Sequence, residues 1–255
     1  MEFEPTPITL PNSPVPLFPL PGVFLFPHQV LPLHIFEERY RTMVAELLDG
    51  PGRFVIASPL LGEAAEPGKP PSVIPVGGFG EILRHEKLDD GRYMIWVLGL
   101  SRVHIEEVDC ETPYRQVECL PFMETVVPED EASDLVRELR DAASSRLKEP
   151  LPLPDSTPPG LLADLLMQTL QAERSLVERA FIEPDVLTRA QLALEEAERR
   201  LGSDQDRPSE SDGDDRAQGS IEFMENMFDG MDFGPMAEDG EDDGEEEPED
   251  RPDDE

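Results

Sequence analysis

A phosphate-binding loop is the first chemistry that the residue pattern suggests. Residues 62 to 69 read G-E-A-A-E-P-G-K, and glycines followed by a lysine can wrap a nucleotide phosphate. The P-loop pattern, however, needs four residues between its glycines, and after the lysine a Ser or Thr that holds Mg²⁺. Here five residues separate Gly62 from Gly68, and Pro70 follows Lys69. We therefore interpret the segment as a flexible surface loop and expect no nucleotide cofactor.

Hydrolytic and metal chemistry have no better support. A Ser–Lys peptidase dyad needs a buried lysine that acts as a base, and each of the three lysines lies in a polar or loop setting. The four histidines match no zinc-ligand spacing, and the two cysteines form no C-x₂-C pair. We therefore assign no catalytic, cofactor-binding or metal-binding residue and expect a protein that is not an enzyme. The residues tested are Lys69, Lys87, Lys148, His28, His34, His85 and His104.

The net charge of the chain argues against some classes of binding partner. The chain has a net charge of −36, and residues 203 to 255 carry 23 acidic residues against three arginines. Such a field repels phosphate backbones and anionic lipids, so we expect no nucleic-acid and no membrane partner. The first ten residues hold two Glu and no basic residue, unlike a secretory signal, and prolines interrupt the most apolar segment, residues 15 to 26. These features predict a soluble, cytoplasmic protein.

The two cysteines, Cys110 and Cys119, fall on what we predict to be adjacent strand segments. A disulfide between them is geometrically conceivable. Because nothing else in the sequence indicates an oxidising compartment, we prefer two reduced, partly buried thiols.

The elements that must position these residues are mainly strands in the first half of the chain. Leu31, Leu33 and Ile35 alternate as one face of a strand should, and residues 54 to 58 and 114 to 122 form further strands. One helix interrupts them, with apolar residues at helical spacing from Tyr40 to Leu48, and the Gly-Pro-Gly at positions 50 to 52 ends it.

The longest β segment is a predicted hairpin made of residues 73 to 88 and 92 to 108. Asp90 and Gly91 form its turn, because Gly accepts the positive φ that a tight turn needs. Residues 93 to 98 are apolar on both faces, whereas beyond Gly99 apolar and polar residues alternate. This change of phase predicts a bulge or bend near Gly99.

Beyond Pro128 the apolar period becomes helical. One helix follows Pro128, three more are centred near residues 161 to 170, 176 to 181 and 185 to 201, and a Pro-rich linker covers residues 149 to 159. Glu195 and Arg199 have the spacing of an i, i+4 ion pair.

Residues 203 to 255 are too polar and too charged to offset the entropy of ordering the chain, so we predict disorder. One apolar segment interrupts this tail at helical spacing, which is typical of a short helix that docks in a groove. It either docks in the protein's own groove or on a partner, or is simply a group of sticky residues in a solubilising tail. The candidate docking residues are Phe223, Met224, Met227, Phe228 and Met231.

Three stretches of the chain resemble, in the same order, parts of the N-terminal substrate-binding domain of Lon proteases. The first comprises residues 16 to 20 (PLFPL), 23 to 28 (VFLFPH) and 31 to 33 (LPL). The second runs from residue 76 to residue 91 and resembles the central hairpin of that family. The third, residues 99 to 105, has the pattern G-x-x-R-x-x-I. Residues 160 to 201 resemble, more weakly, the helical bundle of the family.

The resemblance implies an α+β fold in which a twisted, PUA-like β pseudo-barrel with one interrupting helix precedes a small helical bundle. We expect a loose lead-in over residues 1 to 14, the β domain over 15 to 127, the bundle over 128 to 202 and the tail over 203 to 255. The chain ends before the ATPase and peptidase modules of Lon proteases would begin, so the resemblance implies neither ATP hydrolysis nor proteolysis.

The function that we expect is recognition of unfolded or extended polypeptides, as an adaptor or chaperone related to Lon substrate selection, through a hydrophobic groove between barrel and bundle. A AAA+ protease or a chaperone would be a further partner. The alternative is a small-molecule-binding or regulatory domain on the same barrel, although Trp96 is the chain's one tryptophan and an aromatic cage is poorly supplied. RNA binding, suggested by other PUA-like barrels, conflicts with the acidic charge.

Overall fold

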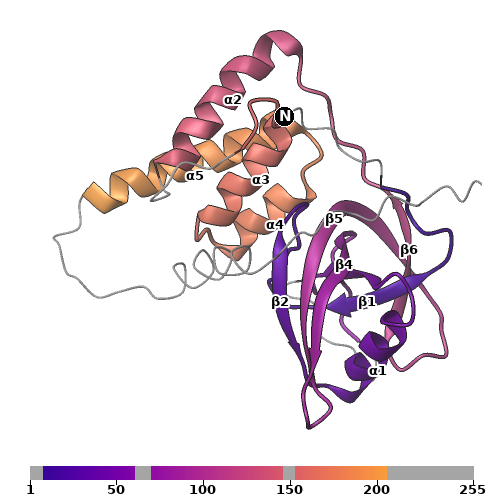
Figure 1. Cartoon of the computed structure of the whole chain (residues 1–255). Coiled ribbons are helices and arrows are strands. Elements are labelled where there is room, and N and C mark those ends of the chain that lie inside the picture. The colour runs from indigo at the N-terminus through magenta and orange to yellow at the C-terminus, as the bar shows by residue number, and fades with distance from the viewer. Residues whose placement is uncertain (1–7, 61–69, 146–152, 206–255) are drawn as a thin grey trace, which may run out of the picture. The chain divides into compact units, whose positions relative to one another are not determined.

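The computed structural model describes residues 8 to 60, 70 to 145 and 153 to 205. Six strands precede four of the five helices in these ranges (Figure 1). The strands are β1 (Val15–Pro19), β2 (Val30–Ile35), β3 (Arg53–Ala57), β4 (Val76–Lys87), β5 (Tyr93–Val108) and β6 (Arg115–Pro121). The helices are α1 (Glu38–Leu47), α2 (Glu129–Ser144), α3 (Pro159–Thr169), α4 (Arg174–Ile182) and α5 (Val186–Gln205). The predicted α+β class is confirmed.

Five of the strands close into a barrel. β1 pairs with β3, β3 with β4, β4 with β5, β5 with β6, and β6 again with β1. The β1–β3 pair is parallel and the other pairs are antiparallel. β2 stands outside this ring and pairs with the first part of β5, from Tyr93 to Leu98.

The long hairpin has the turn and the irregularity that the sequence predicts. Gly91 adopts φ 79° in the turn between β4 and β5. Phe79 lies opposite Ser101 and Gly80 opposite Gly99, so Leu100 is the extra residue of a bulge. A Cβ added at Gly99 would collide with the carbonyl oxygen of Phe26, so the chain after β1 can cross β5 here because Gly99 has no side chain.

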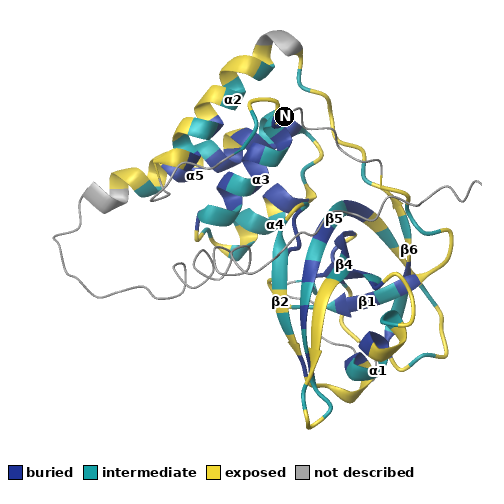
Figure 2. Ribbon diagram, in the orientation of Figure 1, coloured by how far each residue is buried: buried dark blue, intermediate teal, exposed yellow. Residues whose placement is uncertain are grey.

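Two apolar clusters fill the barrel and a third joins it to the helices (Figure 2). Helix α1 closes one end of the barrel with Tyr40, Met43 and Val44, which pack on residues of β1, β2, β3 and β5. The third cluster unites barrel residues with the buried faces of α2 to α5. Its barrel members are Phe24, Phe26, Ile74 and Val76.

Helices lie at all the predicted positions, with ends that differ by a few residues. The predicted ion pair is wrong in its partner: Arg199 pairs with Glu196 at 2.6 Å, one turn away on α5, while Glu195 accepts a hydrogen bond from Gln191. Both cysteines are free, and burial raises the pKa of the Cys119 thiol to about 11. None of the helices in the described ranges is both long and apolar enough to cross a membrane.

Candidate functional site

The pairing of β1 with β6 closes the ring over only part of β1, and it leaves a gap between the end of β1 and β2. β6 pairs with β1 only through Val15, Pro16 and Leu17, so beyond Leu17 this edge of β1 faces no strand of the described ranges. β2 is the edge strand of the sheet and pairs with β5 alone among the described strands. We call the resulting gap the seam, bounded by residues 18 to 20 and 33 to 36.

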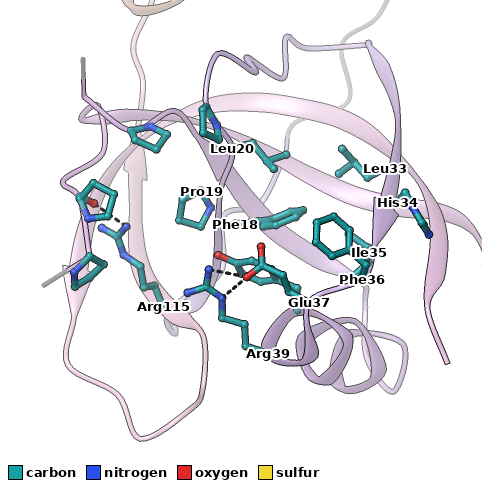
Figure 3. Close-up of a pocket in the computed structure, with 15 residues that line it drawn as sticks. Phe18, Pro19, Leu20, Leu33, His34, Ile35, Phe36, Glu37, Arg39 and Arg115 are labelled. Carbon is teal, nitrogen blue, oxygen red and sulfur yellow. Dashed lines mark hydrogen bonds and ion pairs between the residues drawn. The ribbon is translucent and has the colours of Figure 1, made fainter. Parts of the chain in front are cut away.

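A pocket of about 340 Å³ occupies the seam (Figure 3). Phe18 and Leu20 line it from the β1 side, and Leu33 and Ile35 from β2, so two elements that do not pair with each other form its walls. The close-up shows these side chains around one space, with the start of α1 below it. The other lining residues are Pro19, Pro21, His34, Phe36, Glu37, Arg39, Tyr40, Pro59, Pro70, Pro71 and Arg115.

The apolar side chains of this pocket lie at different depths. Phe18 is buried and packs on Tyr40, with ring centroids 4.4 Å apart. Phe36, directly after β2, is 62% exposed. A buried aromatic floor beside an exposed aromatic rim is typical of a surface that covers a partner's apolar side chain, because the exposed ring gains most when water leaves it.

Two arginines lie at the rim of the pocket, and each is paired with a glutamate. Arg39 lies 4.5 Å from the centre of the Tyr40 ring and pairs with Glu37 at 2.8 Å. Arg115 donates a hydrogen bond of 3.0 Å to the carbonyl oxygen of Pro71 and also pairs with Glu107. Burial raises the pKa of Tyr40, so its hydroxyl stays protonated at neutral pH. The pocket therefore offers an apolar floor and a polar rim whose arginines are paired with glutamates.

A separate polar cluster joins the barrel to the helices. Arg102 of β5 and Arg189 of α5 both contact Asp164 of α3, and Glu124 pairs with both arginines. Burial raises the pKa of Asp164, against the opposing pull of the two arginines. Burial also works to raise the pKa of Glu124, but there the arginines outweigh it and the pKa falls below its usual value. With its charges matched and largely buried, this cluster fastens two parts of the fold.

The contact between barrel and bundle, where a groove was predicted, is core in part. Phe26 packs edge-to-face on Phe181 of α4 at 5.1 Å, and Phe24 packs on the same ring at 5.5 Å. Close apolar packing stabilises this part of the contact because it leaves little void. The groove itself stays a prediction, and the pocket described above lies in the seam.

The sequence-predicted docking segment, Phe223, Met224, Met227, Phe228 and Met231, lies outside the described residues, as do the loop glycines Gly62 and Gly68. Within the described ranges, no three His, Cys, Asp or Glu side chains converge to hold a metal ion. Sequence reasoning missed the seam as a site. The available signal was Phe36, a large apolar residue placed between a strand and the acidic start of a helix.

A family model, the substrate-binding domain of the ATP-dependent protease La (Lon), matches residues 14 to 199. The chain belongs to the Lon substrate-binding domain family. The resemblance read from the three sequence stretches is thereby confirmed, and the Lon domain is a substrate-recognition module.

Lon proteases of several bacteria are similar to this Lon-domain protein. The Lon protease of Desulfosudis oleivorans is 24% identical over 171 residues, which cover 64% of this chain and 21% of that protein. Lon protease 2 of Bdellovibrio bacteriovorus is 26% identical over 208 residues, covering 76% of this chain and 25% of that protein. The matched region thus spans about a quarter or less of these proteases.

A solved structure shows the same fold. The N-terminal domain of the Mycobacterium avium complex Lon protease superposes with a TM-score of 0.55 at 17% identity, over 73% of this chain and 98% of that domain.

Proposed function

We propose that this Lon-domain protein binds unfolded or extended polypeptides in the seam pocket, without chemistry of its own, and acts as an adaptor or chaperone. The observation that carries the proposal is the pairing of a buried apolar floor, Phe18, with an exposed aromatic rim, Phe36, beside a strand edge. Family membership supports a protein substrate. An adaptor would hold a client for a AAA+ protease or chaperone, which would then be its second partner.

The size of the expected effect follows from the exposure of Phe36. Complete burial of a Phe side chain is worth about 1.5–3 kcal/mol, and covering the exposed part of Phe36 should contribute about 1–2 kcal/mol. At 1.4 kcal/mol for each tenfold change, loss of this side chain weakens binding by about 5- to 30-fold.

Fluorescence anisotropy tests the proposal, with the full chain titrated into a labelled, reduced and carboxymethylated model protein that cannot fold. Phe36→Glu should weaken binding at least tenfold, because it also places a carboxylate where apolar contact is expected. The matched control is Met123→Glu, since Met123 is 77% exposed and lies outside the pocket lining. Equal binding by both variants would reject the seam as the site, and absence of binding by the parent chain would reject the function.

A small ligand is the alternative occupant. The pocket volume of about 340 Å³ lies at the lower end of the range for ligand sites, about 300–1,000 Å³. Trp96 contributes nothing to the lining; its ring instead lies under the guanidinium of Arg84 at 5.1 Å. Thermal shifts of the full chain across a metabolite panel, abolished by Phe36→Glu, would favour this alternative over polypeptide binding.

A further inference from the structure

We propose that the polypeptide bound in the seam adds to the sheet as an extra strand, paired with the outer edge of β2. This inference rests on the proposed function and specifies how the partner is recognised: through its backbone, with side chains selected at every second position.

The outward-facing backbone groups of β2 follow from its pairing with β5. The N–H of Gly99 donates to the carbonyl oxygen of Gln29 at 2.8 Å, and the register continues without a shift from Val30 opposite Leu98 to Ile35 opposite Tyr93. Strand backbone groups point to alternate sides. Leu31, Leu33 and Ile35 therefore direct their N–H and C=O groups toward β5, and the alternate residues direct theirs away from it.

The alternate residues are Val30, Pro32 and His34. Pro32 has no N–H, which agrees with this assignment because a proline facing β5 would leave a gap in the ladder. Among the described strands none pairs with this outer edge, which thus offers two N–H donors, on Val30 and His34, and three carbonyl acceptors. A proline at the middle of an edge strand also weakens uncontrolled pairing with other chains.

The pocket lies beside this edge, so strand pairing and side-chain binding act together. Leu33 and Ile35, on the inner face of β2, line the pocket, and an added strand would run about 4.8 Å from β2. Its inward side chains would rest over the apolar floor formed by Phe18 and Leu20, and the alternate side chains would face solvent.

The occupant is therefore an extended segment of another polypeptide, apolar at alternate positions. A second copy of this protein fits the edge less well. Each copy carries a net charge of −36, so two copies repel each other, and both would bring a Pro32 that lacks a donor. An unfolded segment keeps its backbone groups available for pairing with the edge of β2.

A backbone N-methyl scan tests the pairing directly. The probe is the acetylated octapeptide Glu-Val-Thr-Leu-Thr-Val-Glu-Gly, titrated against the full chain, with two derivatives N-methylated at alternate residues of opposite parity. Strand pairing predicts that one derivative loses at least tenfold in affinity, because its methyl groups face β2, while the other stays within about threefold of the parent. Equal effects of both derivatives would overturn the inference and leave the function standing. Absence of octapeptide binding by a chain that still binds the carboxymethylated model protein would also overturn the inference and leave the function standing.

Two readouts on the protein complete the test. The amides of Val30 and His34 should exchange more slowly with solvent when the octapeptide binds. Pro32→Ala restores a donor to the edge and should tighten binding by about two- to tenfold. Unchanged amide exchange at saturating peptide would overturn the inference. A dimer of the free protein that protects the same amides would also overturn the inference, because it assigns the edge to a second copy. Tighter peptide binding by the full-length Phe228→Glu variant would overturn it as well, because it assigns the edge to the chain's own tail segment.

Discussion

The guanidinium of Arg102 on β5 holds the carboxylate of Asp164 on α3 through two parallel hydrogen bonds, of 3.1 and 2.9 Å. Both side chains are 2% exposed, and Arg189 contacts the same carboxylate at 3.0 Å. Arg102 belongs to the G-x-x-R-x-x-I stretch through which the sequence resembles the Lon domain. That arginine fastens the barrel to the helices and lies apart from the pocket.

Asp164→Asn should lower the free energy of unfolding by about 3–5 kcal/mol, because it leaves two buried arginines with Glu124 as their one acidic partner in this cluster. Urea denaturation measures the change. Asp134→Asn is the control, since its pair with Arg137 is exposed on both sides and should contribute less than about 1 kcal/mol. A loss below 1 kcal/mol for Asp164→Asn would show that the cluster does not fasten the fold.

Gly99→Ala should destabilise the protein by more than about 3 kcal/mol, because the new methyl group meets the carbonyl oxygen of Phe26 in a closely packed crossing. Thermal unfolding measures the effect. The matched control is Gly202→Ala on α5, where an added Cβ meets nothing within 4 Å and helix propensity favours alanine by up to about 1 kcal/mol. A melting temperature that Gly99→Ala leaves unchanged would contradict the packing of the β1–β2 connection on β5.

Glu196 should make part of the stability depend on acid pH. Hydrogen bonds from Arg199 lower the pKa of Glu196 to about 2. Burial opposes this shift, and hydrogen bonds from Arg200 add to it. Because the folded pKa lies below the unfolded value near 4.5, the contribution is complete above pH 4.5 and disappears as the pH falls toward 2. The Glu196→Gln variant should therefore lose less stability than the parent between pH 5 and pH 2. Identical pH profiles in urea denaturation would exclude this role.

Local patterns predicted most elements because their causes are local. The alternation of Leu31, Leu33 and Ile35 marks β2, and Gly91 marks the hairpin turn by its positive φ. The change of phase at Gly99 correctly indicated a bulge. Such signals depend on neighbouring residues, so a single sequence contains them.

The site depends on pairing between strands that are far apart in the chain, and local sequence patterns do not indicate such pairing. The seam exists because β6 stops pairing with β1 at Leu17 and because β2 pairs with β5, whose partner residues lie 58 to 68 positions further along the chain. The same limit applies to the contact between barrel and bundle: Phe24 and Phe26 are apolar, but only the fold shows that Phe181 covers them. The positions of apolar residues in a sequence do not show whether those residues form an exposed binding surface or part of the core.

Site-specific photo-crosslinking tests the central claim most directly. The photoreactive residue p-benzoylphenylalanine replaces Phe36 in the full chain or, as the control, Val126, which is 91% exposed and outside the pocket lining. Each protein is irradiated with the carboxymethylated model protein, and crosslinks are mapped by mass spectrometry. The seam account predicts strong crosslinking from position 36 and background from position 126. If both proteins bind the model protein but crosslinking from position 36 is no stronger than from position 126, the result contradicts the seam as the binding site.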